Sequence, residues 1–385
     1  MLRFAMDLIT IPTQNPPGDR LQECIERIAL ELEHLQLPAT VDEIPLDGSG
    51  DRRYWVHAHT PGSGPILYFH GHYDVVPASA PGQFDAVVRD GRLFGRGSAD
   101  MKSGIALMTY AAAAVASSVV ELNGRIGLTF VPDEETGGDR GSGYLARASL
   151  LGTEGIGMLS AEPTGGVVWN ANRGAASMRV TIRGRSAHIG LAHTGSSAFD
   201  SMVKVANALS ELRTEVMSRR TLGAVNPPGA DRSILLVGGE FGGGSNFNVV
   251  PDLATFTVDR RTNPEEDLRA ELDRIHEIVD GFQREGVDIS VETFQYGESA
   301  ASSAESPLAR DLARAITEVQ GRTPKFEICP GLLEIRFYAA LGQPAYAYGP
   351  GGLELAHGNQ ESVELAEINE IALVYALTAA RHLST

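Results

Sequence analysis

The chain has 385 residues, of which 43% are hydrophobic and 21% are charged. This balance excludes a disordered or low-complexity protein and leaves enough chain for one or two domains with a buried core. The 49 acidic residues outnumber the 32 basic ones, and the resulting net charge of −17 argues against nucleic acid or an anionic membrane as a partner.

The first part of the chain alternates helices and strands. Apolar residues at helical spacing predict a helix over residues 21–35, and an alanine-rich stretch predicts a buried helix within 104–120. Hydrophobic runs bounded by turn residues predict strands at 53–59, 66–70, 125–131, 157–161 and 167–171. Strands separated by helices favour an α/β sheet with functional loops at the strand ends.

The pattern changes near Ala175. The predicted order becomes strand, helix, strand, strand, helix, strand, at residues 177–182, 196–212, 233–237, 254–260, 264–283 and 287–293. This order is typical of the ferredoxin-like split arrangement. The α/β pattern then resumes with elements at 307–320, 344–348 and 364–382. We therefore expect an α/β domain of residues 1–174 and 295–385, with an α+β insert of residues 175–294.

Two cysteines, Cys24 and Cys329, are present, and neither belongs to a CxxC pair. This excludes a disulfide scaffold and a cysteine-rich zinc module. Asp7 precedes any apolar run at the N-terminus, so we expect no signal sequence and a cytoplasmic protein.

His72 and Asp74 follow the predicted strand 66–70, two positions apart. In extended chain both side chains project to the same side. The pair suits an imidazole that binds a metal and a carboxylate that fixes its tautomer. A histidine without a ligand role is the commoner explanation of such a pair taken alone.

Asp100 lies within residues 95–104, whose glycines resemble a dinucleotide fingerprint only superficially. The carboxylate replaces the third glycine and points to a cation rather than a pyrophosphate. A helix cap is an equally good explanation of this aspartate by itself.

Glu134 and Glu135 come directly after the strand 125–131. Neighbouring side chains in extended chain diverge, so one carboxylate can bind a metal while the other handles a proton. A solvated turn is the alternative. Glu162 follows another strand, and His357 lies beyond a glycine-rich turn. Together the strand ends offer two histidines and several carboxylates, which suit zinc, and a shared carboxylate can hold two ions ~3.5–4 Å apart.

Four segments carry a family resemblance: GHYDVVP at 71–77, GRGSADMKSG at 95–104, PDEETGG at 132–138 and AEPT at 161–164. Their order and spacing resemble those of the dinuclear-zinc amidohydrolases and exopeptidases, which include acetylornithine deacetylase, succinyl-diaminopimelate desuccinylase, aminoacylase and glutamate carboxypeptidase. The resemblance covers essentially the whole chain. It implies a zinc-exopeptidase-like α/β catalytic domain with a ferredoxin-like lid and dimerisation domain.

The resemblance also implies a set of metal ligands. His72, Asp100 and Glu162 would bind one zinc ion, and Asp100, Glu135 and His357 would bind the other, with Asp100 as the bridge. Cobalt would be able to replace zinc.

Further roles follow from the same resemblance. Asp74 would orient the histidine, and Glu134 would act as general base and acid. His188, in the insert, would polarise the scissile carbonyl, often from the partner subunit of a homodimer. Asn248 and Arg261 would bind a carboxylate of a small-molecule substrate. The alternatives are that His188 is an ordinary surface histidine and that Arg261 is a salt-bridge partner.

Two segments depart from the family pattern. Gln360 stands where relatives have asparagine, and Asn359 comes one position early. Residues 329–336 lack the Thr-Asp or Ser-Asp pair that relatives have in this glycine turn. The substrate of any one relative therefore does not transfer to this chain.

We hypothesise that the protein hydrolyses an amide bond in a small carboxylate-bearing substrate, with an N-acyl amino acid as the leading candidate. The alternatives are a dipeptidase or carboxypeptidase of the same family, or a non-catalytic metal- or peptide-binding relative. A serine hydrolase is disfavoured because the chain lacks a Gly-x-Ser-x-Gly elbow. The glycine run at 242–244 lacks the lysine of a phosphate-binding loop.

Overall fold

The strand that leads to His72 lies in the middle of a nine-stranded sheet in a computed structural model, which describes residues 1–45 and 52–384. The chain divides into two compact units. Unit 1 comprises Met1–Ala171, Ala301–Glu327 and Leu333–Thr385, and unit 2 comprises Asn172–Ala300 and Ile328–Leu332. The sequence places the insert at 175–294, so unit 2 extends slightly beyond those limits and also takes in a short segment that the sequence assigns to the α/β domain.

The large sheet runs in the order β1-β2-β6-β3-β7-β15-β8-β13, with β14 paired to β8. Its strands are β1 (Ala39–Ile44), β2 (Arg53–His59), β3 (Ile66–His72), β6 (Arg125–Val131), β7 (Gly155–Pro163), β8 (Val168–Asn172), β13 (Ala300–Ala301), β14 (Phe326–Cys329) and β15 (Ala345–Gly349). Strands β6, β3, β7 and β15 are parallel to one another, so their carboxyl ends meet at one edge. This edge is where ligands bind in α/β sheets.

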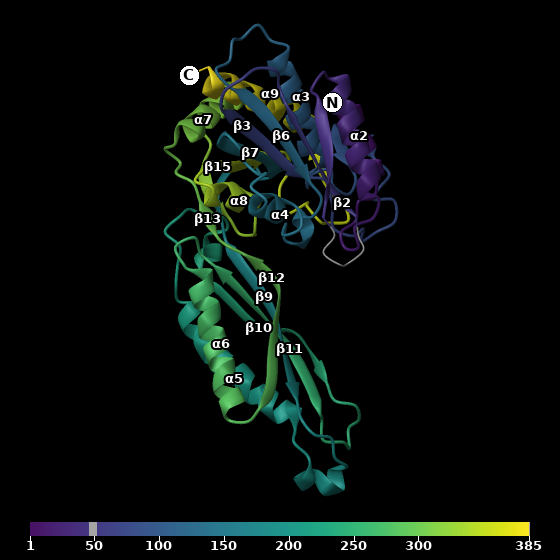
Figure 1. Cartoon of the computed structure of the whole chain (residues 1–385), viewed down its shortest axis with the longest axis vertical. Coiled ribbons are helices and arrows are strands. Elements are labelled where there is room, and N and C mark those ends of the chain that lie inside the picture. Colours follow the sequence, from purple (N-terminus) through teal and green to yellow (C-terminus); the bar gives the residue numbers. More distant parts are fainter. Residues whose placement is uncertain (46–51, 385) are drawn as a thin grey trace. The chain divides into compact units, whose positions relative to one another are not determined.

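Helices cover both faces of this sheet, as expected for strands that are hydrophobic throughout. The helices of unit 1 are α1 (Leu2–Thr10), α2 (Leu21–His34), α3 (Lys102–Ala116), α4 (Ser142–Arg147), α7 (Pro307–Gln320), α8 (Ile335–Ala340) and α9 (Leu365–Leu383), and Figure 1 shows them around the sheet. Phe69 of β3 packs edge-on against Tyr375 of α9, with ring centroids 5.0 Å apart. On the opposite face, Tyr68 and His70 meet Tyr338 of α8.

Helix α3 approaches the sheet unusually closely at Gly104. A Cβ atom at this glycine would lie 2.7 Å from the carbonyl oxygen of Ala161 in β7. The absence of a side chain therefore lets the start of α3, and Asp100 just before it, lie against the strand that carries Glu162.

Some elements are absent from the sequence-based expectations. Helix α1 is short. Its C-terminal end is held by a residue far away in the sequence, because the buried Lys102 ammonium donates to the carbonyl oxygens of Leu8 and Ile11 at 2.8 and 2.6 Å. A small sheet, in the order β16-β5-β4, is also formed by β16 (Ser362–Glu364), β5 (Arg92–Phe94) and β4 (Val87–Arg89). A search of the helices in the described ranges finds no segment with the length and hydropathy that a bilayer span requires.

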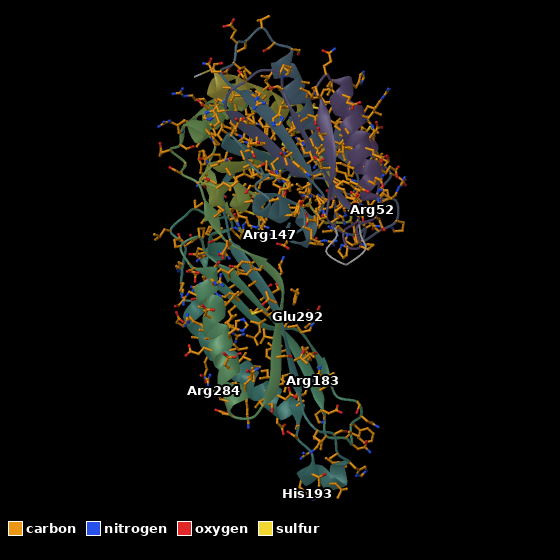
Figure 2. The ribbon with its side chains drawn as sticks, in the orientation of Figure 1. Arg52, Arg147, Arg183, His193, Arg284 and Glu292 are labelled. Carbon is orange, nitrogen blue, oxygen red and sulfur yellow. The ribbon has the colours of Figure 1, made fainter. Side chains whose placement is uncertain are left out.

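Unit 2 has the predicted ferredoxin-like order. Its antiparallel sheet runs β10-β11-β9-β12, and Figure 1 shows both helices on one side of it. The elements in chain order are β9 (Gly174–Arg183), α5 (Ala198–Val216), β10 (Ile234–Gly243), β11 (Leu253–Thr262), α6 (Leu268–Arg284) and β12 (Asp288–Gly297). Met178, Val180 and Ile182 of β9 are buried in the core of this unit. Arg183 and Glu292, labelled in Figure 2, are exposed.

A buried arginine interrupts the apolar core of unit 2. The guanidinium of Arg260 pairs with Glu266 at 2.7 Å and with Glu271 at 2.9 Å. Arg219 reaches the same two carboxylates at 2.6 and 3.0 Å. Burial opposes ionisation of both glutamates, but hydrogen bonds from Ser233, the Asn263 amide and Arg219 keep the pKa of Glu266 below its usual value. Hydrogen bonds from Arg219 and Arg260 do the same for the pKa of Glu271.

We expect the substitution Arg260→Met to lower the free energy of unfolding of unit 2 by about 3–5 kcal/mol, because it leaves two carboxylates in a buried site with one cation fewer. Urea unfolding followed by far-ultraviolet circular dichroism measures the change. The matched control is Arg179→Met, since Arg179 pairs with Glu240 on the exposed surface and its loss is expected to cost about 0.5 kcal/mol or less. Equal stability of the two variants would contradict a structural role for the buried network.

Candidate metal centre

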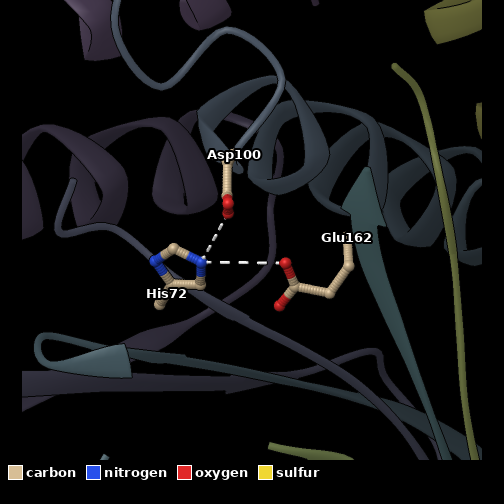
Figure 3. A group of neighbouring side chains, drawn as sticks. All are labelled: His72, Asp100 and Glu162. Carbon is tan, nitrogen blue, oxygen red and sulfur yellow. Dashed lines mark hydrogen bonds and ion pairs between the residues drawn. The ribbon is translucent and has the colours of Figure 1, made fainter. Parts of the chain in front are cut away.

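Three of the predicted ligands come together at the carboxyl edge of the large sheet. His72 is the last residue of β3, Glu162 lies near the end of β7, and Asp100 precedes α3. The Nε2 atom of His72 lies 3.0 Å from Asp100 Oδ1 and 3.8 Å from Glu162 Oε2, as Figure 3 shows. All three residues are buried. We call them the first ligand group.

A second set of predicted ligands shares Asp100. The Nε2 atom of His357 lies 3.2 Å from Asp100 Oδ2 and 3.2 Å from Glu135 Oε2. Glu135 belongs to a 3₁₀ turn, Glu134–Thr136, that follows β6, and His357 lies in the loop after β15. We call Asp100, Glu135 and His357 the second ligand group. The two oxygens of one carboxylate thus face two different groups.

The electrostatics of this cluster favour cations. The pKa of Glu135 is raised to about 7 by burial and by the negative charge of Asp100. Burial and neighbouring carboxylates raise the pKa of Glu134 and of Glu162 as well. Hydrogen bonds to Asp100 and Glu135 raise the pKa of His357 to about 10. Negative charge therefore exceeds positive charge in a buried place, and a divalent ion in each group would restore the balance.

The donor atoms also fit zinc. Each ligand group offers one imidazole nitrogen and two carboxylates, and the candidate ligand atoms within each group lie within 4.8 Å of one another. Three protein ligands of these types with a further open position are the usual arrangement at a catalytic zinc ion.

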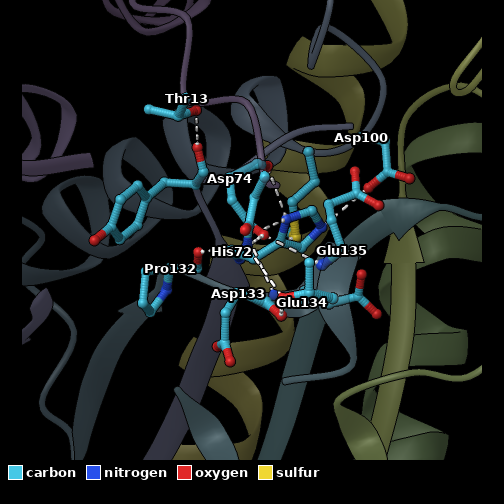
Figure 4. A network of polar contacts seen from close by, with 12 residues as sticks. Thr13, His72, Asp74, Asp100, Pro132, Asp133, Glu134 and Glu135 are labelled. Carbon is cyan, nitrogen blue, oxygen red and sulfur yellow. Dashed lines mark hydrogen bonds and ion pairs between the residues drawn. The ribbon is translucent and has the colours of Figure 1, made fainter. Parts of the chain in front are cut away.

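Asp74 holds the parts of the centre together. Its Oδ1 atom lies 3.3 Å from Nδ1 of His72, on the ring edge opposite the ligand group. The carboxylate also accepts hydrogen bonds from the backbone amides of Glu134 and Glu135, both at 3.2 Å, and from the side chain of Asn15 at 2.8 Å. Figure 4 shows this network. Asn15 belongs to no motif, so no sequence pattern predicts this contact with Asp74.

Glu134 belongs to neither ligand group and directly precedes Glu135 in the 3₁₀ turn. Its backbone amide donates a hydrogen bond to Asp74, so the start of this turn is held at the end of β3. The side chain is only partly shielded from solvent. Its position leaves it free to exchange a proton.

The segment 329–336, which departs from the family pattern, contacts residues next to the candidate ligands. Glu334 Oε2 lies 2.7 Å from Nε2 of the buried His70, two residues before the metal-facing histidine of β3. Arg336 donates to the carbonyl oxygens of Gly137 at 2.6 Å and Leu333 at 2.7 Å, and so holds the end of the turn that carries Glu134. The departure from the family pattern is visible in the sequence, but these contacts are not.

The remaining predicted residues belong to unit 2. His188 is exposed, and its Nδ1 atom accepts a hydrogen bond from the amide of Gly190. The next amide, that of Ile189, donates to the carbonyl oxygen of Asn248 at 3.0 Å, so these two segments lie together. Arg261 makes a two-pronged ion pair with Asp259, at 2.7 and 3.0 Å.

Comparison with known proteins identifies the family. The sequence profile of Peptidase family M20/M25/M40 matches residues 68–381. Succinyl-diaminopimelate desuccinylase of Nitrosomonas europaea is 30% identical over 327 residues, which cover 82% of this chain and 83% of the relative.

Solved structures show the same fold. The M20 family metallo-carboxypeptidase Sso-CP2 of Sulfolobus solfataricus matches with a TM-score of 0.78 at 15% identity, over 100% of this chain and 98% of that one. The YXEP protein of Bacillus subtilis, described as a dinuclear metal binding peptidase, matches with a TM-score of 0.68 at 17% identity, over 100% and 97% of the two chains. The resemblance seen in the sequence is thereby confirmed, and this protein belongs to Peptidase family M20/M25/M40, a family of metal-dependent hydrolases that act on amide bonds.

Proposed function

We propose that this protein is a two-zinc deacylase that hydrolyses the amide bond of a small N-acyl amino acid. The observation that carries the proposal is the Asp100 carboxylate, whose two oxygens face two histidine-containing ligand groups. Glu134, which belongs to neither group, precedes the candidate ligand Glu135 in the same turn. The desuccinylase relative supports the substrate class, because its name describes removal of an acyl group from an amine.

The metal ions would be held by the first and second ligand groups. Bound zinc supplies Lewis acidity to a water molecule and to the carbonyl of the substrate. His72 would supply a ligand nitrogen. Asp74 holds the imidazole ring so that its Nε2 atom faces Asp100 and Glu162.

Glu134 would move the proton. A general base works best when its pKa lies near the working pH, and burial together with the neighbouring carboxylates raises the pKa of Glu134 in that direction. The carboxylate would take a proton from the attacking water and then give it to the leaving amine. Since Glu135 and Glu162 belong to the ligand groups, Glu134 is the acid left over for this task.

Residues of unit 2 would complete the site. We assign His188 the task of donating a hydrogen bond to the developing oxyanion, from the partner subunit of a homodimer that forms through unit 2. Arg261 and Asn248 would bind the carboxylate of the substrate. The Nε and Nη2 atoms of Arg261 bind Asp259, so the Nη1 edge is the one that we assign to the substrate.

A dipeptidase or carboxypeptidase is the second candidate. The likeness of the fold to a metallo-carboxypeptidase favours it, and the chemistry at the metal centre would be the same. A non-catalytic role is disfavoured because a metal-binding protein has no use for the additional carboxyl group of Glu134.

Zinc-loaded protein is expected to release the amine product from N-succinyl and N-acetyl amino acids at least about tenfold faster than it cleaves dipeptides. The reason is that a site whose polar atoms hydrogen-bond the acyl group disfavours a substrate without that group, since those atoms are then left unpaired. Chromatography of the released amino acid gives kcat/KM for each substrate. Treatment with EDTA is the control and should remove activity, with recovery on addition of zinc or cobalt. Faster cleavage of dipeptides would select the second candidate.

The substitution Glu134→Gln is expected to reduce kcat about 10²–10⁴-fold, because it removes the proton acceptor, while the zinc content stays that of the wild type. Steady-state kinetics and elemental analysis check the two parts. Asp139→Asn is the matched control, since Asp139 is an exposed carboxylate in the same loop, paired with Arg147. A Glu134→Gln enzyme that works at the wild-type rate would remove this residue from the mechanism.

The substitution His188→Ala is expected to lower kcat about 10²–10³-fold through loss of an oxyanion donor, with zinc binding unchanged. The control is His193→Ala, an exposed histidine of the same 3₁₀ segment, labelled in Figure 2. Mixed dimers of the Glu134→Gln and His188→Ala chains should regain activity if the histidine acts across the dimer. Failure of the mixture to regain activity would place His188 in the same subunit as the metals it serves.

A further inference from the structure

A buried ion pair lies directly behind the second ligand group. The Nη1 atom of Arg96 is 2.5 Å from Oε2 of Glu361, and the two side chains are 1% and 0% exposed. The pair joins the loop before α3 to the loop before β16, which are far apart in the sequence. Neither residue is a candidate ligand.

Glu361 fixes the backbone that carries Asp100. Its Oε1 atom accepts hydrogen bonds from three amides of one loop, those of Gly97 at 2.9 Å, Ala99 at 3.1 Å and Asp100 at 3.2 Å. Three donors that converge on one charged oxygen leave the loop little freedom, because hydrogen bonds to an ionised acceptor are stronger than those between neutral groups.

Arg96 fixes the backbone that carries His357. Its Nη2 atom donates to the carbonyl oxygen of His357 at 3.1 Å and to that of Pro77 at 3.4 Å. His357 adopts a left-handed backbone conformation, with φ of 63°, which is uncommon for a residue other than glycine and needs such support. Val76, which precedes Pro77 in the chain, donates its backbone amide to Oε1 of Glu135 at 3.2 Å.

The two ligand groups depend on this pair to different extents. In the second ligand group, Asp100 and His357 are both held by Arg96 or Glu361. In the first ligand group only Asp100 is held in this way, because His72 and Glu162 stand on the strands β3 and β7.

We propose that Arg96 and Glu361 form a positioning pair that sets the metal affinity of the second ligand group. A buried ion pair adds little net stability compared with an apolar pair of the same size, so we assign it the role of fixing the loops to which it is hydrogen-bonded. The inference rests on the proposed function, since it requires metal ions in both ligand groups.

The test is calorimetric titration of zinc into the metal-free full chain. Glu361→Gln is expected to weaken the zinc equivalent of the second ligand group about 10–100-fold, as is usual when a partner of a ligand is lost. The other equivalent should weaken by a smaller factor, because the first ligand group depends on the pair through Asp100 alone. The His357→Ala variant identifies which equivalent belongs to the second ligand group. Glu364→Gln is the matched control, because Glu364 pairs with Arg92 on the surface of the same small sheet.

A second variant guards against loss of folding, which circular dichroism detects. Arg96→Lys keeps the charge opposite Glu361, but an ammonium group lacks the fork that reaches both carbonyl oxygens, so it should weaken the same zinc equivalent. Wild-type titration curves for both variants, or equal weakening of the two equivalents, would overturn the proposal while leaving the two-zinc function intact. A wild-type chain that binds no zinc would overturn both.

Discussion

The shared carboxylate of Asp100 is the interaction on which the rest of the site depends. Hydrogen bonds from His357 and His72 lower its pKa although burial opposes the shift, so it carries its charge inside the protein. Each oxygen faces one ligand group, and the remaining carboxylates then crowd around two imidazoles. Such an excess of buried negative charge is unfavourable unless cations enter, which gives the centre its affinity for metal.

The surrounding structure holds these charges at short range by buried polar contacts. Asp74 fastens the turn of Glu134 and Glu135 to the end of β3, and Arg336 fastens the end of the same turn to α8. Glu361 does the same for the loop of Asp100. Each of these residues accepts from or donates to at least one backbone group of a loop, so it fixes the loop as well as individual side chains.

Unit 2 differs from unit 1 in how its sheet is covered. Its sheet has one face covered by α5 and α6, and the other carries charged and polar side chains such as Arg179 and Glu292. Arg261 pairs with Asp259 on the strand β11, so its guanidinium is already partly neutralised. Recognition of an anion there would depend on the geometry of the free edge more than on net charge.

Sequence patterns predicted the fold class, and the family resemblance implied the candidate ligands. Hydrophobic strands followed at once by His72, Glu134 and Glu162 predict an edge lined with metal-binding groups, because parallel strands end on the same side. The hydrophobic periodicities of the insert likewise predicted its βαββαβ order. These features are local: each depends on residues that are neighbours in the chain.

The contacts that hold the candidate ligands become visible in the folded chain alone. Glu361 meets the loop of Asp100 across more than 260 residues, and Asn15 reaches Asp74 from near the N-terminus. A glutamate or an asparagine in a loop looks the same in the sequence whether it is solvated or buried. Long-range hydrogen bonds arise when the chain folds, and no periodicity or spacing in one sequence encodes them.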